Sequence, residues 1–530
     1  MKNLNFVKKD NNSNGITLVA LIITIIVLLI LAMVSIRLVI NGGIIGKAEH
    51  GKDKYSEAEI KEQINLAYSE WKMSNESNGG INLKDVLENR LEEIYGAENV
   101  SITEQGKIIN VGVKNYIVTL MEDGRIEEGQ LVSLDIANGS IQIKSNGYIQ
   151  GSNALVPYKG RYLITGTTTT NMIKVVEQGT YNIILKDLNI KTKKCPLNAN
   201  VNRFSTGCNV NITLEGENSL IGTDQASGIG FSALGSTTNT NGVIIESTLT
   251  IDGPGKLYAE GSTYMAGIGC GHGEPSGVAG NIVINGGDIT ARSVMNGAAI
   301  GSGLYNDASD ITINNGILHI STGAYGGGIG SKSGQKIDNV VINGGKIYIN
   351  SGRIGSNTKG SGKVQINGGY IKSPSVIGGK NSEVIISGGV IDIQNTGEAP
   401  IQCVDGGNIK FTGGNILARG KNNLNIATFE EGTSNLISYT PKDGTNDLYE
   451  TPIKLQDVGE NKKVTKLTTS DNINYGVKDV YTLEDGMLYL YLPKTTEART
   501  ITIEVDGKTY SGAVETKETP ETTVTLTKIN

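Results

Sequence analysis

The chain has 530 residues and a formal net charge of −6, so it is too long for one compact domain and lacks the basic surface that nucleic acid needs as a main partner. Its 71 glycines do not recur at every third position, which excludes a collagen-like chain. Glycine spread through segments rich in Ile, Val, Thr and Asn instead predicts a mainly β chain of short strands and tight turns.

Residues 16–36 form an apolar run without a charged side chain. A helix of this length is about 31 Å long, enough to cross the hydrocarbon core of a bilayer. Lys2, Lys8 and Lys9 precede the run, which predicts a single-pass cell-membrane protein with a cytoplasmic N-terminus and the bulk of the chain at the cell surface. A signal anchor is favoured over a cleaved secretory signal, because the run is long and no small-residue cleavage site follows it.

The same stretch resembles the leader of type IV prepilins and pseudopilins. In that family a short basic leader ends in glycine, a prepilin peptidase cuts after this glycine, and an apolar helix follows. The leader would be residues 1–15, with Gly15 as its last residue and Ile16 as the first of the mature chain. The resemblance implies pilin-like subunits as partners. However, the fifth mature position holds Ala20 where the family usually has Glu, which bears against incorporation into a filament.

Helical spacing of apolar residues continues beyond the membrane segment, so residues 16–75 are predicted to form a transmembrane, pilin-like helix. Residues 76–130 are predicted to form a small α/β head. In this head Asn82 is the expected N-cap of a helix, and two strands are expected over residues 108–113 and 116–121.

Residues 131–435 contain a repeat that decides the predicted fold. Seven copies of a strand–turn–strand motif, such as IVINGGDITAR and VVINGGKIYIN, recur at spacings of 20 to 33 residues. Variable spacing around a fixed motif indicates one coil per repeat, with insertions confined to loops. Apolar residues alternate with polar ones in each copy. When the coils stack, the apolar residues form the continuous core of a parallel β-helix, which is expected to be right-handed.

The turn of this motif carries asparagine at one position in four coils, namely Asn285, Asn314, Asn343 and Asn367. Stacked amides can hydrogen-bond from coil to coil and satisfy polar groups at a tight bend, which predicts a structural ladder rather than a site. Glycine at the following positions supplies a positive φ without steric cost.

The segment AGIGCGHGEPSG, residues 266–277, looks like a site because Cys270, His272 and Glu274 lie among alternating glycines. Aligned with the repeats AAIGSG and GGIGSK, it is one corner of a coil, and Cys270 takes the place of Ser302. No second cluster of ligands accompanies these side chains, so neither a metal site nor a nucleophile is predicted here.

Residues 131–430 resemble a family of glycine-rich β-helix proteins on the surface of gut-dwelling, low-GC Gram-positive bacteria, often described as carbohydrate-binding-domain proteins. The resemblance is carried by YLITGTTTTNMIKV, YNIILKDLNI and NITLEGENSLIG, together with the AGIG corners. It implies a surface protein that contacts a polysaccharide or a host glycan.

The repeats stop near residue 435. Strand-like runs over residues 447–455, 487–493 and 500–514 alternate with turns. Residues 436–530 are therefore predicted to form a β-sandwich-like domain or a capping sheet.

Parallel β-helices include polysaccharide lyases and glycoside hydrolases, whose chemistry needs clustered carboxylates. The outward columns of the repeat place no two acids on neighbouring coils, so no catalytic residue, metal or cofactor is assigned. Asp392 beside Lys372 is interpreted as a solvated surface pair. Cys195 and Cys208 could pair, but two free thiols are expected, because disulfides concentrate in small, Cys-dense domains.

One outward face carries four rings that are candidate glycan contacts: Tyr258, His319, Tyr348 and Tyr370. Tyrosine combines an apolar face with a polar tip, which suits stacking on sugar rings. The long loops over residues 265–280 and 298–310 are a second candidate binding edge. The favoured function is a non-enzymatic, membrane-anchored or pilus-associated surface protein that binds glycan or mediates adhesion. A polysaccharide-active enzyme and a structural minor pilin or pseudopilin remain as alternatives.

Overall fold

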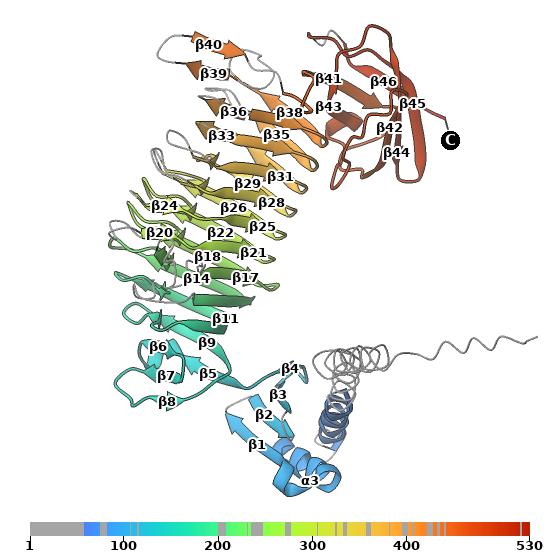
Figure 1. The fold of residues 1–530 in the computed structure, drawn as a ribbon. Coiled ribbons are helices and arrows are strands. Elements are labelled where there is room, and N and C mark those ends of the chain that lie inside the picture. Colours follow the sequence, from blue (N-terminus) through green and yellow to red (C-terminus); the bar gives the residue numbers. More distant parts are fainter. Residues whose placement is uncertain are drawn as a thin grey trace, which may run out of the picture. The chain divides into compact units, whose positions relative to one another are not determined.

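The computed structural model describes residues 58–74 and 82–529, apart from short gaps at residues 106–107, 114–115, 200–207, 231, 235–246, 271–276, 305, 324–325, 332–336, 357–361, 381, 395–400, 405–407, 421–427, 432–434, 439–440 and 520–521. The prediction of a mainly β chain is confirmed (Figure 1). The described residues divide into two compact units, with the boundary between Gln130 and Leu131. The first 57 residues, with the predicted leader and membrane segment, lie outside the described part.

The first unit is a small α/β head with its own core. Its elements are a helix over residues 58–74, α3 (Leu83–Tyr95), the 3₁₀ turn η1 (Ala97–Asn99) and an antiparallel sheet of β1 (Val100–Gln105), β2 (Ile108–Val113), β3 (Tyr116–Met121) and β4 (Ile126–Glu128). Asn82 caps α3, since its side-chain oxygen accepts the Lys84 amide at 2.8 Å. Ile64 and Ala67 of the first helix pack with Leu91 of α3 and the sheet.

The second unit begins with strands that start its coils. They are β5 (Leu131–Asp135), β6 (Ile141–Lys144), β7 (Gly147–Gln150), β8 (Val156–Pro157), β9 (Arg161–Thr168), β10 (Ile173–Val175), β11 (Gly179–Thr192) and β12 (Leu197–Asn198), with the 3₁₀ turn η2 (Ile136–Asn138). β6, β7 and β8 pair antiparallel at the outer end, where Tyr148, Tyr158 and Tyr162 meet edge to face. From β9 onward each coil pairs in parallel with the next.

We call residues 131–419 the coil stack. Its coils are joined by three parallel ladders, which are compatible with the predicted β-helix (Figure 1). The first contains β13 (Cys208–Glu215), β17 (Thr248–Asp252), β21 (Asn281–Ile284), β25 (Ile311–Ile313), β28 (Asn339–Ile342), β31 (Lys363–Ile366), β34 (Glu383–Ile386) and β37 (Asn408–Phe411). The second contains β14 (Glu217–Gly222), β18 (Lys256–Gly261), β22 (Asp288–Ser293), β26 (Ile317–Thr322), β29 (Lys346–Ile349), β32 (Tyr370–Ser373), β35 (Val390–Gln394) and β38 (Asn415–Arg419).

The third ladder is built from very short strands at the Ile-Gly corner. It runs from β12 through β15 (Ile229–Gly230), β19 (Ile268–Gly269), β23 (Ile300–Gly301), β27 (Ile329–Gly330), β30 (Ile354–Gly355), β33 (Ile377–Lys380) and β36 (Ile401–Val404). Side strands outside these ladders are β16 (Ser232–Leu234), β20 (Gly277–Ala279) and β24 (Asp307–Ala308), and the hairpin β39 (Thr428–Glu431) with β40 (Asn435–Ser438).

The period-two pattern of the sequence explains the core of the stack. Ile251, Ile284 and Ile313 pair in register on three successive coils and are fully buried. In each of these strands the side chain of the preceding residue points to the opposite, outer face. Burying one such side chain contributes about 1.5–3 kcal/mol before the entropy of ordering the chain is subtracted. The columns of isoleucine, valine and leucine therefore form one continuous core along the stack.

The Ile-Gly corner requires glycine because successive coils approach closely there. Gly301 has φ of +131°, and a Cβ at this position would lie 1.9 Å from the carbonyl oxygen of Gly330. No side chain fits between the two backbones, so the glycine of this motif is fixed by packing between coils.

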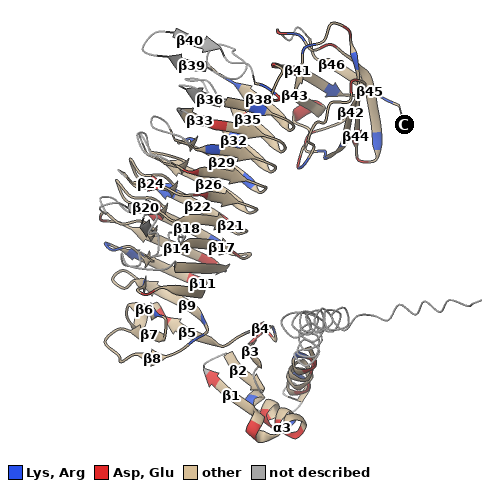
Figure 2. Ribbon diagram, viewed as in Figure 1, with Lys and Arg blue, Asp and Glu red and all other residues tan. Residues whose placement is uncertain are grey.

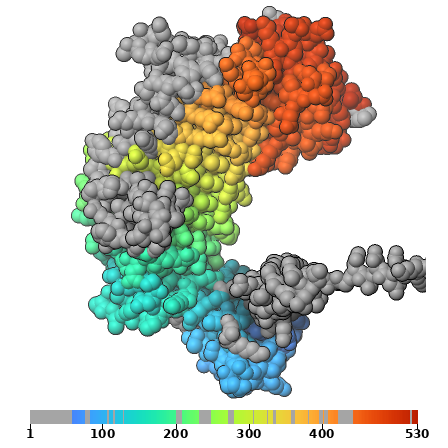
Figure 3. All heavy atoms as spheres, viewed as in Figure 1, coloured from blue at the N-terminus to red at the C-terminus, as the bar shows by residue number. Residues whose placement is uncertain are grey.

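The C-terminal part of the second unit is a six-stranded sheet with a separate core. Its elements are β41 (Leu448–Leu455), β42 (Val464–Thr469), the 3₁₀ turn η3 (Glu484–Gly486), β43 (Met487–Pro493), β44 (Arg499–Val505), β45 (Lys508–Val514) and β46 (Val524–Lys528), in the order β42-β44-β45-β46-β41-β43. We call it the C-terminal sheet. It lies against the last coils of the stack (Figure 3).

Candidate functional site

Three of the four predicted rings form a continuous strip on the second ladder. His319 of β26 and Tyr348 of β29 are register partners on neighbouring coils, and their rings stack at 5.3 Å between centroids with 12° between planes. Tyr370 of β32 lies diagonally beyond Tyr348, with centroids 6.0 Å apart. We call these three residues the aromatic strip.

Tyr258 lies apart from the strip. Thr290 separates it from His319 in the same column, and its hydroxyl donates to Glu260 Oε2. Arg292 Nη1 binds the same carboxylate oxygen at 2.5 Å. Partial burial, followed by the bond to Glu260, raises the pKa of Tyr258. This ring is therefore held in a local polar contact, two coils away from the strip.

A groove of about 1020 Å³ runs beside the strip. Its floor is the outer face of the stack, including Asn314, Asn343, Lys346, Tyr348 and Tyr370, and its lining extends from Gly287 to Val390. These residues belong to five successive coils, and coils about 4.8 Å apart give a length of about 19 Å. The groove is thus long enough for several units of a polymer.

The opposite wall of the groove comes from the domain of the C-terminal sheet, through Glu460, Asn461 and residues 478–479 and 481–483. The sequence predicts a β-sandwich-like domain or a capping sheet here but no groove wall, because no motif in this segment indicates which turns it would contact. The turn glycines of the last coils give no such signal, since earlier coils carry glycine at the same positions.

The wall is fixed to these glycines by backbone hydrogen bonds. Gly389 N donates to Lys478 O at 2.7 Å, and Gly414 N donates to Gly476 O at 3.0 Å. A Cβ on Gly388 would lie 2.7 Å from Lys478 O. Glycine in these turns therefore serves close docking of a second domain as well as the bend itself.

Asn415 connects the last coil to the C-terminal sheet. Its side-chain amide donates to the carbonyls of Tyr481 and Met487 at 2.8 and 3.2 Å, and its Oδ1 accepts the Tyr489 amide at 2.7 Å. The sequence pattern places this residue in an outward column, yet it is 0% exposed because the sheet covers it. All three bonds are made in a dry contact, where unpaired groups are costly.

An ion pair between a half-buried arginine and a buried glutamate reinforces the same contact. Arg419 of β38 binds Glu450 of β41 through two parallel bonds, Nη1–Oε2 at 2.6 Å and Nη2–Oε1 at 2.8 Å. The Tyr491 hydroxyl donates to Glu450 Oε2 at 2.9 Å, and burial raises the pKa of Tyr491 well above its usual value. The carboxylate is thus fully partnered, as a buried charge requires.

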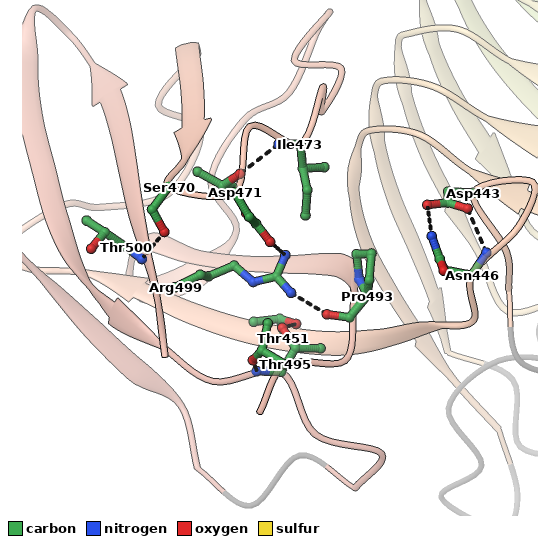
Figure 4. A network of polar contacts seen from close by, with 12 residues as sticks. Asp443, Asn446, Thr451, Ser470, Asp471, Ile473, Pro493, Thr495, Arg499 and Thr500 are labelled. Atoms are coloured by element: carbon green, nitrogen blue, oxygen red, sulfur yellow. Dashed lines mark hydrogen bonds and ion pairs between the residues drawn. The ribbon is translucent and has the colours of Figure 1, made fainter. Parts of the chain in front are cut away.

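Arg499 stabilises the interior of the C-terminal sheet. Figure 4 shows its guanidinium between Asp471, whose Oδ2 lies 3.0 Å from Nη1, and the carbonyl of Pro493, which accepts from Nη2. Burial lowers the pKa of this guanidinium and Asp471 opposes that shift. The sheet that carries the groove wall is therefore braced from within.

The four predicted asparagines form a chain of amide hydrogen bonds. Asn314 Nδ2 donates to Asn285 Oδ1, Asn343 to Asn314, and Asn367 to Asn343, each at 2.8 Å. Asn314 and Asn343 of this ladder also line the groove. Each amide carries two N–H groups, and the ladder uses one of those on Asn314 and one on Asn343, which leaves each of these two lining residues a second donor.

Asp392 corrects the sequence interpretation of a solvated pair. Lys372 Nζ lies 4.0 Å from Asp392 Oδ2 and is well exposed, but the aspartate side chain is only 9% exposed. Gln394 Nε2 also donates to Asp392, at 3.1 Å. Asp392 pairs in register with Leu417 of β38, which packs against β43 of the C-terminal sheet, and it interacts electrostatically with Tyr489 of β43.

The AGIGCG corner has the environment of a packed turn. Cys270 and Ser302 are both fully buried, and their amides make the same coil-to-coil bonds to glycine carbonyls. Burial raises the pKa of the Cys270 thiol to about 11, so the thiolate that a nucleophile needs is disfavoured. His272 and Glu274 lie outside the described residues.

Cys195, Cys208 and Cys270 are free thiols. Over the described ranges, no group of three or more His, Cys, Asp or Glu side chains could hold a metal ion. In the same part of the chain, no helix combines the length and apolar character needed to cross a bilayer. Gly15, Ile16 and residues 16–36 lie outside it.

Comparison with known proteins gives no relative: no protein-family model, curated protein or solved structure matches this chain.

Proposed function

We propose that this chain is a cell-surface protein that binds a polysaccharide in the groove between the coil stack and the C-terminal sheet. The observation that carries the proposal is the aromatic strip, in which Tyr348 and Tyr370 line a groove about 19 Å long. Sugar rings present apolar faces that stack on such rings, and amides beside the rings satisfy the sugar hydroxyls. A finer proposal for the scaffold is a right-handed parallel β-helix, supported by its three parallel ladders.

The binding proposal is tested with the full-length chain in detergent against a panel of immobilised polysaccharides. Replacing Tyr348 or Tyr370 with alanine is expected to weaken binding tenfold or more, corresponding to about 1.4 kcal/mol per tenfold. Tyr258→Ala is the matched control, because this tyrosine lies on the same face outside the groove. Binding that survives both groove substitutions would contradict the proposal.

A glycoside hydrolase is the second candidate, favoured by two carboxylates, Glu460 and Asp479, on the same groove wall. Glycosidic hydrolysis uses a carboxylic acid and a second carboxylate about 5–10 Å apart at the scissile bond. The same panel is therefore scored for released reducing ends. Release that Glu460→Gln and Asp479→Asn both abolish would establish this candidate, and binding without release would exclude it for those glycans.

Placement at the cell surface is proposed from the apolar run over residues 16–36 and the lysines before it. N-terminal sequencing of the protein recovered from its native membrane tests the leader. A new terminus at Ile16 would support cleavage by a prepilin peptidase and a pilin-like role. An intact Met1 would contradict processing while leaving a plain membrane anchor.

A further inference from the structure

The charged side chains of the groove are balanced in sign. Lys346 lies on the floor, and Lys478, Glu460 and Asp479 lie on the wall, so two cations face two carboxylates. Within the described residues none of the four forms an ion pair with another side chain. They are therefore available to a ligand and yet create no field of one sign along the groove.

The charges around the strip are also balanced, because they occur in opposite pairs. Asp288 is the register partner of Lys256 on the neighbouring coil and interacts with it electrostatically, and Lys372 Nζ lies 4.0 Å from Asp392 Oδ2. Figure 2 shows the same pattern more widely, with acidic and basic segments interspersed along the stack. A polyanion such as a uronic-acid polymer would meet attraction and repulsion at alternating points, which gives no net gain.

The groove is, however, rich in both hydrogen-bond donors and acceptors. The lysines and the ladder amides of Asn314 and Asn343 donate, whereas the carboxylates of Glu460 and Asp479 accept. A sugar hydroxyl both donates and accepts, so a chain of hydroxyls can satisfy both kinds of group. A hydrogen bond between a hydroxyl and a charged group is stronger than one between two neutral groups. Each unpaired charged side chain of the groove can therefore bind a sugar hydroxyl specifically.

We infer that the ligand of this groove is an uncharged, hydroxyl-rich polysaccharide rather than a polyanionic one. The inference rests on the proposed function and specifies its substrate class. It assigns Glu460 and Asp479 as specificity-determining residues that accept sugar hydroxyls and exclude acidic polymers.

The test compares uncharged probes (mannan, β-glucan and N-acetylglucosamine oligomers) with two polyanions (polygalacturonate and hyaluronate), using the full-length chain in detergent. At least one uncharged probe should bind at least tenfold more tightly than either polyanion. Its affinity should change by less than about twofold between about 0.05 and 0.5 M salt, because no net charge pairing is screened.

A charge-altered variant provides the second arm. Glu460→Lys combined with Asp479→Asn leaves only cations in the groove, and asparagine tolerates the positive φ of position 479. This variant should lose affinity for the uncharged probe and gain salt-sensitive binding of polygalacturonate by at least tenfold. Glu497→Lys combined with Asp457→Asn is the matched control outside the groove. It should change neither the affinity for the uncharged probe nor the binding of polygalacturonate.

The outcomes separate the two proposals. Polyanion binding by the unaltered chain that equals or exceeds binding of uncharged probes would overturn this inference while leaving glycan binding in place. Binding of no probe at all would overturn the proposed function and this inference with it.

Discussion

Asn415→Ala should release the C-terminal sheet from the last coil. The substitution removes three hydrogen bonds of 2.7–3.2 Å, to the Tyr481 and Met487 carbonyls and from the Tyr489 amide, in a fully buried contact. At about 1 kcal/mol each, the loss of docking free energy is about 3 kcal/mol. That energy corresponds to opening of the contact about a hundredfold more often.

Hydrogen exchange of the peptide over residues 487–493 is the suitable assay. The Tyr489 N–H donates to Asn415 Oδ1 at 2.7 Å, so its protection from exchange depends directly on this side chain. Tryptophan fluorescence would not report the change, because the single tryptophan is Trp71 of the first unit. Exchange in this peptide should accelerate strongly in Asn415→Ala.

The control is Asn350→Ala, an exposed asparagine of the stack that should change stability by less than about 0.5 kcal/mol. Unchanged protection of residues 487–493 in Asn415→Ala would refute the claim that this amide holds the sheet. Because the sheet supplies one groove wall, polysaccharide binding should fall together with protection. Lost protection with full binding would mean that the wall contributes nothing to the ligand site.

Four further predictions concern the stack. Asn343→Ala removes two ladder bonds of 2.8 Å and should cost about 1–2 kcal/mol in urea unfolding; an unchanged midpoint would count against the ladder. Gly301→Ala should cost more than about 3 kcal/mol in thermal unfolding, whereas Gly507→Ala, also at positive φ but in open space, should cost only about 1–2 kcal/mol. The Cys270 thiol, whose pKa burial raises to about 11, should resist iodoacetamide at about pH 8 until the chain unfolds, as mass spectrometry can measure. Burial raises the pKa of Tyr162 to about 12, above the unfolded value of about 10, so its stabilisation should be complete below about pH 10 and lost as the pH rises toward 12, which alkaline unfolding would reveal.

Local patterns were enough to predict the coil interior. Ile284 and Ile313 share a column because every coil repeats the same period-two strand and the same turn, so neighbouring coils impose equal environments on equal positions. The same reasoning placed Asn314 above Asn285 and identified Cys270 as a residue of a packed corner. In each case a residue contacts the equivalent residue of the neighbouring repeat, and aligning the repeats is enough to identify that residue.

Alternation and repetition along the chain are sufficient to predict the mainly β chain, the repeating coil, its apolar columns and the asparagine positions. The tertiary structure alone reveals the groove and the burial of Asp392 and Asn415. These features arise where the C-terminal sheet folds back onto turns tens of residues earlier. Such docking depends on surface complementarity between two different domains, and no local period encodes it.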